Sequence, residues 1–267
     1  MLSDDTLKTI DAVAQRAADA ARSTILPFFR TRDLAQENKA ENGFDPVTQA
    51  DRGAEERIRE IIRDARPQDS ILGEEFEAYA GTSGLTWVLD PIDGTRGFIS
   101  GTPTWGVLIA VSDENGPIYG LIDQPYIGER FIGSPLGAHM SGPHGSSALA
   151  ARGARDLSEA TVFTTFPEVG TAAEGRAFKA VSDRANLTRY GMDCYAYALV
   201  AAGQIDLVIE AGLHPYDVHA PIAVIQAAGG IVTNWEGGPA HDGGRVLAAA
   251  NPEIHAQALK ILQDMAE

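Results

Sequence analysis

Residues 87–98 read W-V-L-D-P-I-D-G-T-R-G-F, an apolar run that stops at two carboxylates, Asp90 and Asp93. Pro91 biases the residue before it toward an extended backbone, so we expect Asp90 to end a strand and Asp93 to lie beside it after a tight turn. Two carboxylates held that close repel each other unless a cation lies between them, and Mg²⁺ prefers such oxygen ligands. The stretch therefore predicts a divalent metal site.

The residues that follow could bind and hydrolyse a phosphate. Gly94 permits a tight turn, Thr95 offers a hydroxyl to an attacking water, and free amides at the start of a following helix could hold phosphate oxygens. Together these features favour a metal-dependent phosphatase. The alternative is an ordinary acidic turn at a strand end, and this stretch alone does not separate the two.

Composition limits the classes of partner. The 267 residues include 37 acidic and 21 basic side chains, and the formal net charge of −16 argues against nucleic acid or an anionic membrane. No apolar run approaches the roughly 20 residues of a membrane-spanning helix. Cys194 is the only cysteine, which excludes an internal disulfide. With an acidic N-terminus that lacks a secretory signal, this favours the cytoplasm.

Two amphipathic helices are predicted near the N-terminus. Apolar residues recur at three- and four-residue spacing between Asp4 and Phe28, with Ser3 as the expected N-cap. Thr48-x-x-Asp51 has capping-box spacing, follows what looks like an exposed turn, and predicts a second helix that ends before residue 67. Asp51 would lie in the first turn of that helix, where capping and catalysis are both compatible with a carboxylate.

The chain reads as one unit with two halves. Short β-rich runs within residues 105–133 predict an antiparallel meander in the half that spans residues 1–145. Residues 156–267 alternate between strand and helix patterns, and the poorly patterned residues 141–155 are the expected link. We therefore predict a layered fold of α+β and α/β character.

Four separated motifs resemble those of one family. They are D-P-V-T-Q-A-D at residues 45–51, G-E-E at 73–75, D-P-I-D-G-T at 90–95, and E-A-G-L-H-P-Y-D-V at 210–218 followed by A-G-G at 228–230. In this order they resemble the inositol monophosphatase family over nearly the whole chain. The resemblance implies the αβαβα sandwich of sugar phosphatases, two or three Mg²⁺ ions with Mn²⁺ as a possible substitute, inhibition by Li⁺, and a homodimer.

The resemblance also implies roles for individual residues. The implied metal ligands are Glu74, Asp90, the Ile92 carbonyl, Asp93 and Asp217. The implied catalytic residues are Asp51, Thr95 and Glu74, with Asp51 and Thr95 orienting the attacking water and taking its proton. The implied substrate contacts are Asp93, Gly94, Thr95, Arg96, Asp193 and Glu210. Without the resemblance, Glu75 would rival Glu74, and Asp217 could simply cap a helix.

Three features resemble the histidinol-phosphatase branch of the family. These are Arg96 after D-G-T, the stretch R-Y-G-M-D-C-Y at 189–195 with Met192 in place of a glycine, and H-P-Y-D at 214–217, where that branch has K-P-Y-D. Histidinol phosphate carries an ammonium group and an imidazole, which Asp193 and Glu210 could meet, whereas a polyol gains only hydrogen bonds.

We therefore predict a histidinol-phosphate phosphatase of histidine biosynthesis that acts on a small phosphate monoester. One alternative is an inositol-1-monophosphatase or a related 3′(2′),5′-bisphosphate nucleotidase or sugar phosphatase. The other is a metal-binding regulatory protein without turnover.

Overall fold

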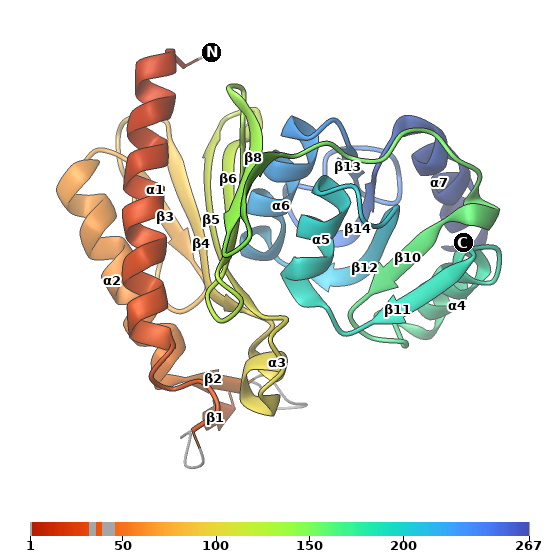
Figure 1. The fold of residues 1–267 in the computed structure, drawn as a ribbon, viewed down its shortest axis with the longest axis horizontal. Helices are drawn as coiled ribbons and strands as arrows, with labels where there is room; N and C mark the ends of the chain where they lie inside the picture. The colour runs from red at the N-terminus through yellow and green to blue at the C-terminus, as the bar shows by residue number, and fades with distance from the viewer. Residues whose placement is uncertain (1, 32–35, 39–45, 267) are drawn as a thin grey trace.

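Helices and sheets alternate in layers across the molecule (Figure 1). The computed structural model describes residues 2–31, 36–38 and 46–266. Helices α1 (Asp4–Ile25) and α2 (Gln49–Ala65) cover the outer face of the first sheet, and α5 (Asp193–Ala201) and α6 (Pro215–Ala227) lie between the sheets. Helices α4 (Ala172–Ser182) and α7 (Pro252–Ala266) cover the outer face of the second sheet. The implied αβαβα sandwich is confirmed.

The first sheet has the strand order β3-β4-β5-β6-β7-β8-β9 within the described residues. Its strands are β3 (Ser70–Gly73), β4 (Thr86–Asp93), β5 (Gly106–Asp113), β6 (Gly116–Gln124), β7 (Glu129–Ser134), β8 (Gly137–Gly142) and β9 (Gly145–Ala148). The predicted antiparallel meander is confirmed. The predicted irregular link over residues 141–155 is wrong at its start, because β8 and β9 pair as a hairpin. The side chains of β9 are small and exposed, so they carry no apolar pattern.

The second sheet has the order β11-β10-β12-β14-β13 within the described residues. Its strands are β10 (Thr161–Thr164), β11 (Leu187–Tyr190), β12 (Leu207–Leu213), β13 (Ile231–Thr233) and β14 (Gly244–Ala249). Strand β10 is parallel to β11 and β12, whereas β14 is antiparallel to β12 and β13. The alternation of strands and helices predicted for this part of the chain is confirmed.

The N-terminal helices begin where the sequence predicts. Ser3 Oγ accepts a hydrogen bond at the start of α1, which ends at Ile25 rather than continuing to Phe28. At the start of α2, the Thr48 amide donates to Asp51 Oδ2 over 2.9 Å, so the capping box is confirmed.

The segment before α2 differs from the prediction of an exposed turn. Strand β1 (Gln36–Asn38) pairs antiparallel with β2 (Pro46–Thr48), and Thr48 is buried. Asp45, the first residue of its motif, lies outside the described residues. Strands of three residues are too short to show an alternating pattern, which is why the sequence did not reveal them.

Alternation along the strands sends side chains into the layers on both sides of each sheet. Trp87 packs in the cluster with α1 and α2, whereas its neighbour Val88 packs against the helices between the sheets. In the second sheet, Leu207 packs in the cluster with α4 and α7, whereas Val208 packs against the helices between the sheets. Strands buried on both faces read as continuous apolar runs, as these do. Among the described helices, none is both long enough and apolar enough to cross a membrane.

Strand β4 does not end at Asp90, as the sequence predicted, but continues to Asp93 through an irregularity. Asp90 pairs with Leu108 and Asp93 with Gly106, so three steps along β4 oppose two steps along β5. In a regular strand, residues three apart point to opposite faces. The extra residue of the bulge cancels this alternation and turns both carboxylates to one side.

Two glycines allow α6 to lie directly on the first sheet. A Cβ at Gly120 would lie 2.3 Å from the Ala220 carbonyl oxygen, and one at Gly133 would lie 2.5 Å from Val224 Cα. These neighbours are helix backbone, which cannot rotate away as a flexible side chain can. The position of α6 against β6 and β7 therefore requires glycine, with no Cβ atom, at both of these residues.

Replacing Gly120 with alanine should displace α6 and lower thermal stability. We expect a loss of about 1–3 kcal/mol, because an extra methyl group in a packed interface forces a backbone shift. Differential scanning calorimetry measures this as a drop in Tm. Gly153→Ala is the matched control, since nothing lies within 4 Å of the added Cβ. Equal Tm values for the two variants would contradict the assigned contact.

Candidate active site

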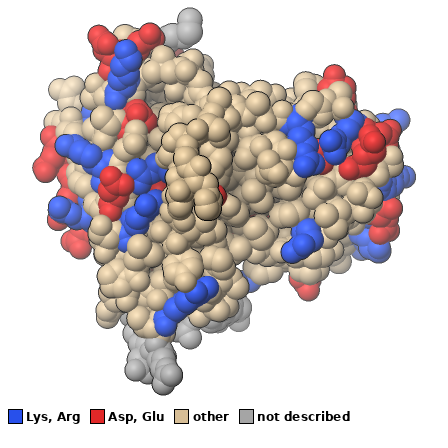
Figure 2. All heavy atoms as spheres, in the orientation of Figure 1, with Lys and Arg blue, Asp and Glu red and all other residues tan. Residues whose placement is uncertain are grey.

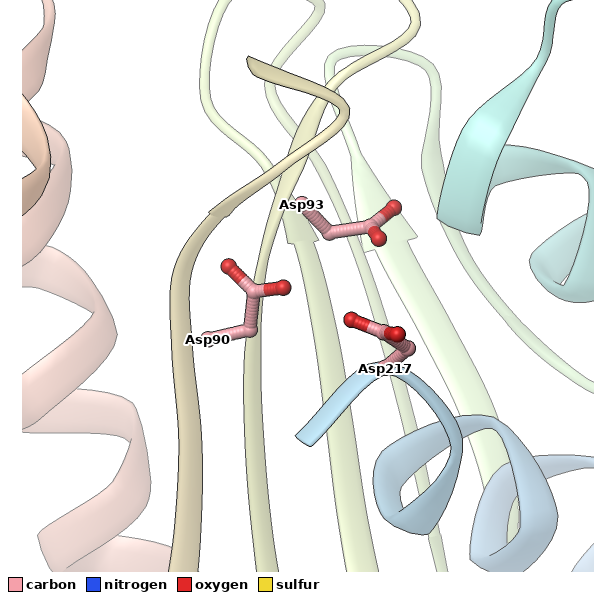
Figure 3. Close-up of side chains that lie close together, drawn as sticks. All are labelled: Asp90, Asp93 and Asp217. Atoms are coloured by element: carbon pink, nitrogen blue, oxygen red, sulfur yellow. The ribbon is translucent and has the colours of Figure 1, made fainter. Parts of the chain in front are cut away.

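Three carboxylates from distant parts of the chain meet at the bulge of β4. Asp90 and Asp93 come from that strand, and Asp217 comes from the first turn of α6. Figure 3 shows the three side chains turned toward one another, and each offers an oxygen within 4.8 Å of the others. The sequence motifs predicted this convergence. Asp217 also accepts a hydrogen bond from the His214 amide (2.6 Å), so the same carboxylate caps α6 and takes part in the acidic cluster.

Burial and like charge make this cluster unfavourable when it is fully ionised. Burial raises the pKa of Asp90 and of Asp93 well above the ordinary value, and acidic neighbours raise both further. Burial also raises the pKa of Asp217 to about 6. The charges that act most strongly on Asp90 are Glu74, Asp93 and Asp217, with Asp51 next. Oxygen ligands alone, with an excess of negative charge, suit a hard divalent cation such as Mg²⁺.

The backbone of the bulge joins the same site. The Ile92 amide donates to Asp90 Oδ1 over 3.0 Å, and the Ile92 carbonyl accepts a hydrogen bond from Thr95 Oγ1 over 3.1 Å. Cys194, at the start of α5, donates its amide to Asp93 Oδ2 over 2.6 Å. This last bond ties the second half of the chain to the bulge.

Helix α2 holds the loop that begins with Glu74. Glu55 accepts a hydrogen bond from the Glu75 amide (2.8 Å), and the Arg59 guanidinium donates to the carbonyls of Phe76 (3.0 Å) and Glu77 (3.1 Å). Glu55 and Arg59 are both buried and pair with each other. The sequence analysis missed these two residues. Their spacing of four residues from one another and from Asp51 places all three on one helix face, which was a usable signal.

Asp51 lies on the same face of α2 and is fully buried. Its Oδ2 accepts two hydrogen bonds from Thr48, whereas its buried Oδ1 has no hydrogen-bond partner among the described residues. The pKa of Asp51 is raised to about 6, mainly by burial and to a smaller extent by the charge of Glu74, while the hydrogen bonds from Thr48 oppose the rise. Asp51 is therefore a buried carboxyl group with a raised pKa and one oxygen that accepts no hydrogen bond within the described part of the chain.

A cleft opens beside the acidic cluster, between the bulge of the first sheet and the C-terminal ends of β10 and β12 in the second sheet. It encloses about 240 Å³. Its walls come from the turn before α3 (Thr95–Ser100), the loop after β10, the start of α5 and the end of β12. The lining includes all the implied substrate contacts, namely Asp93, Gly94, Thr95, Arg96, Asp193 and Glu210.

Asp193 enters the cleft with a backbone φ of +46°, which is uncommon for any residue but glycine. Its carboxylate accepts a hydrogen bond from Thr104 (3.3 Å) and packs against Gly94, where a Cβ would lie 2.7 Å from Asp193 Cγ. Burial raises the pKa of Asp193 to about 6, although Thr104 and the charge of Arg96 oppose this. Met192 has an ordinary φ of −111°, so methionine fits at this position without backbone strain.

Glu210 lies deeper in the same cleft. Thr165 donates to Glu210 Oε1 through its amide (2.9 Å) and its hydroxyl (2.5 Å), and the Tyr197 hydroxyl lies 3.4 Å from Oε2. Burial raises the pKa of Glu210 to about 7, and the charge of Asp193 contributes in the same direction. Thr165 and Tyr197 were missed by the sequence analysis because no motif contains them.

Comparison with known proteins identifies the family. The model of the inositol monophosphatase family matches residues 6–267. The chain belongs to this family.

Among its relatives, the chain is 39% identical to the bifunctional phosphatase IMPL2 of Arabidopsis thaliana, over 98% of this chain and 77% of that protein. It is 35% identical to the histidinol-phosphatase of Streptomyces coelicolor, over 94% and 95% of the two chains. The solved structure of an inositol monophosphatase from Zymomonas mobilis has a TM-score of 0.85 and 35% identity, covering 98% of this chain and 100% of that one.

As a member of the inositol monophosphatase family, the protein is a phosphatase of small phosphate monoesters, and metal dependence is a property of the family. The acidic cluster fits that property, since Asp90, Asp93 and Asp217 supply oxygen ligands around one point. The non-enzymatic alternative is therefore set aside.

Mg²⁺ binding to this member of the inositol monophosphatase family should strengthen as pH rises. A carboxyl group whose pKa is raised by folding destabilises the folded state above that pKa, so the metal-free protein should lose stability as pH rises from about 4 to about 7. Mg²⁺ reverses this loss by pairing with the ionised groups, Asp217 among them with its pKa of about 6.

The measurement is Tm at about pH 5 and about pH 8, with EDTA or with excess Mg²⁺. We expect the Mg²⁺-induced rise in Tm to be several degrees larger at the higher pH. An equal rise in Tm at the two pH values would show that the carboxyl groups of the cluster do not change their protonation when the metal binds.

Proposed function

We propose that this protein hydrolyses histidinol phosphate with the help of Mg²⁺. The observation that supports this substrate is a pair of carboxylates that line the cleft beside the acidic cluster, the half-buried Asp193 and the buried Glu210. Burial is the main cause of the raised pKa of both groups, so an added positive charge beside either carboxylate would favour its ionised form. A leaving group with two cationic nitrogens would supply that charge, whereas a neutral polyol would not. Relatives named histidinol-phosphatase agree with this substrate.

The proposed metal ligands are Glu74, Asp90, the Ile92 carbonyl, Asp93 and Asp217. Two or three bound Mg²⁺ ions, or Mn²⁺ in their place, would neutralise the carboxylates and stabilise the charge that develops on the phosphate and the leaving oxygen. The protein's task is to place these ligands and to keep Asp51 and Thr95 beside them.

Asp51 and Thr95 act on the attacking water. Thr95 Oγ1 lies 3.1 Å from the Ile92 carbonyl, so the hydroxyl is already oriented at the edge of the cluster. The free Oδ1 of Asp51 takes the proton, for which a pKa of about 6 is well suited. The Gly94 and Thr95 backbone faces the cleft and lies beside the phosphate in this arrangement. The water then displaces the alcohol in line, without a phosphoenzyme.

A polyol phosphate is the second candidate. The Thr165 and Tyr197 hydroxyls around Glu210 could share hydrogen bonds with sugar hydroxyls. The Zymomonas mobilis protein, named an inositol monophosphatase, is as similar as the histidinol-phosphatase relatives. Inhibition by Li⁺ and assembly as a homodimer are further proposals that rest on the family resemblance, and a monomeric mass in solution would contradict the second.

Asp193→Asn should reduce selectivity for histidinol phosphate. The amide keeps the size of the side chain but removes its charge, so kcat/KM for L-histidinol phosphate should fall about 10- to 100-fold, the range for a lost charged hydrogen bond. With myo-inositol 1-phosphate the change should stay within about threefold. Phosphate release with both substrates and Mg²⁺ gives the comparison.

Glu129→Gln is the matched control, because this carboxylate contacts the same helix through Tyr195 but does not line the cleft. Equal losses on both substrates would contradict the role of Asp193. A wild-type preference for myo-inositol 1-phosphate or adenosine 3′,5′-bisphosphate would contradict the proposed substrate.

Asp51→Asn should lower kcat by about 10²- to 10⁴-fold, the usual contribution of a general base. Asparagine can still accept the hydrogen bond from Thr48, so the helix cap and the fold should persist. The Mg²⁺ concentration for half-maximal activity should change little, because Asp51 is not a proposed ligand. A kcat within a few-fold of wild type would reduce Asp51 to a helix cap.

A further inference from the structure

The loop between β10 and α4 lines the cleft but has no part in the hydrolytic step. Thr165 anchors one end of it by holding Glu210, and the Val169 amide donates to the Phe166 carbonyl over 3.2 Å. Val169 is buried with a φ of +44°, a conformation that a β-branched residue adopts only when its surroundings fix it. Thr171 then caps α4. The loop is therefore a defined turn with a fixed position in the wall of the cleft.

Phe166 stands at the exposed corner of this turn. Its side chain is 45% exposed and lines the cleft. The guanidinium of Arg96, from α3 on the opposite wall, lies over its ring at 4.9 Å from the centroid. The charge of Arg96 also acts on Asp193. One planar cation in the lining of the cleft thus covers an aromatic face and also acts electrostatically on a carboxylate.

We propose that the face of Phe166 binds the imidazole ring of the substrate, and that Arg96 covers this face until the substrate enters. The inference rests on the proposed function and deepens it by naming a residue that distinguishes an aromatic, cationic leaving group from a polyol. A guanidinium and an imidazolium are both flat, delocalised cations, and an aromatic face attracts either one. The ring that carries the first is therefore suited to carry the second.

The neighbours of Phe166 supply the remaining recognition. Thr165, next to it in the chain, holds Glu210, and Asp193 lies within the electrostatic reach of Arg96. A leaving group that replaces Arg96 on the ring would have both carboxylates available for its cationic nitrogens. A polyol carries no cation, so it gains no cation–π attraction from Phe166.

L-histidinol without phosphate isolates this contact from the metal-dependent part of the site. Phe166→Leu should raise the inhibition constant of L-histidinol about five- to tenfold, within the range for a cation–π contact, and Phe166→Tyr should leave it unchanged within about twofold. The inhibition constant of inorganic phosphate and kcat/KM for myo-inositol 1-phosphate should stay at the wild-type value in both variants.

Tyr79→Leu is the matched control. Tyr79 is 39% exposed and carries the Arg63 guanidinium over its ring at 5.2 Å, but it does not line the cleft. L-histidinol inhibition should be the same in this variant as in the wild type.

Two outcomes separate the proposals. Suppose that the wild type prefers L-histidinol phosphate. If Phe166→Leu then leaves the inhibition constant of L-histidinol unchanged, or lowers kcat/KM for myo-inositol 1-phosphate by the same factor, the role of Phe166 is wrong and the proposed function stands. If the wild type does not prefer L-histidinol phosphate, the proposed function fails, and the assignment of Phe166 fails with it.

Discussion

Repulsion among buried carboxylates is the constraint on which the rest of the structure depends. Asp90 is buried and Asp93 and Asp217 are half-buried, each offers an oxygen within 4.8 Å of the others, and the charges that act most strongly on Asp90 are acidic. Such a cluster is unfavourable by itself and becomes favourable when a cation neutralises it. Binding of that cation and binding of an anionic phosphate are then one electrostatic event, which explains how a chain with a net charge of −16 can act on phosphate monoesters.

The fold resists this repulsion with backbone geometry rather than with basic side chains. The bulge of β4 turns two carboxylates to one side, and the Gly120 contact sets the position of α6, which carries the third. Helix α2 presents Asp51 and fixes the Glu74 loop through Glu55 and Arg59. The Cys194 amide binds Asp93 and so aligns the substrate-facing second half with the first.

Much of this arrangement could be predicted from the sequence, because the motifs contain the residues whose side chains are needed for metal and phosphate chemistry. The pairing of Asp90 with Asp93, both N-terminal helices and the alternating second half followed from local patterns, whereas Asp217 joined the cluster only through the family resemblance. The end of β4 was placed too early, since a bulge depends on the register of β5 and leaves no local signature. The hairpin of β8 and β9 was missed because its small polar residues resemble a loop. The sequence did not point to Thr165 and Phe166, because they line a cleft whose walls come from segments far apart in the chain.

The most direct test of the central claim is to locate the cation itself. Crystals grown with Mn²⁺ would give anomalous density at the metal positions. The account predicts peaks within about 2–2.5 Å of carboxylate oxygens of Asp90, Asp93 and Asp217, the usual range for oxygen ligands of hard cations. Ordered carboxylates with no anomalous density between them, at Mn²⁺ concentrations that support full activity, would contradict it.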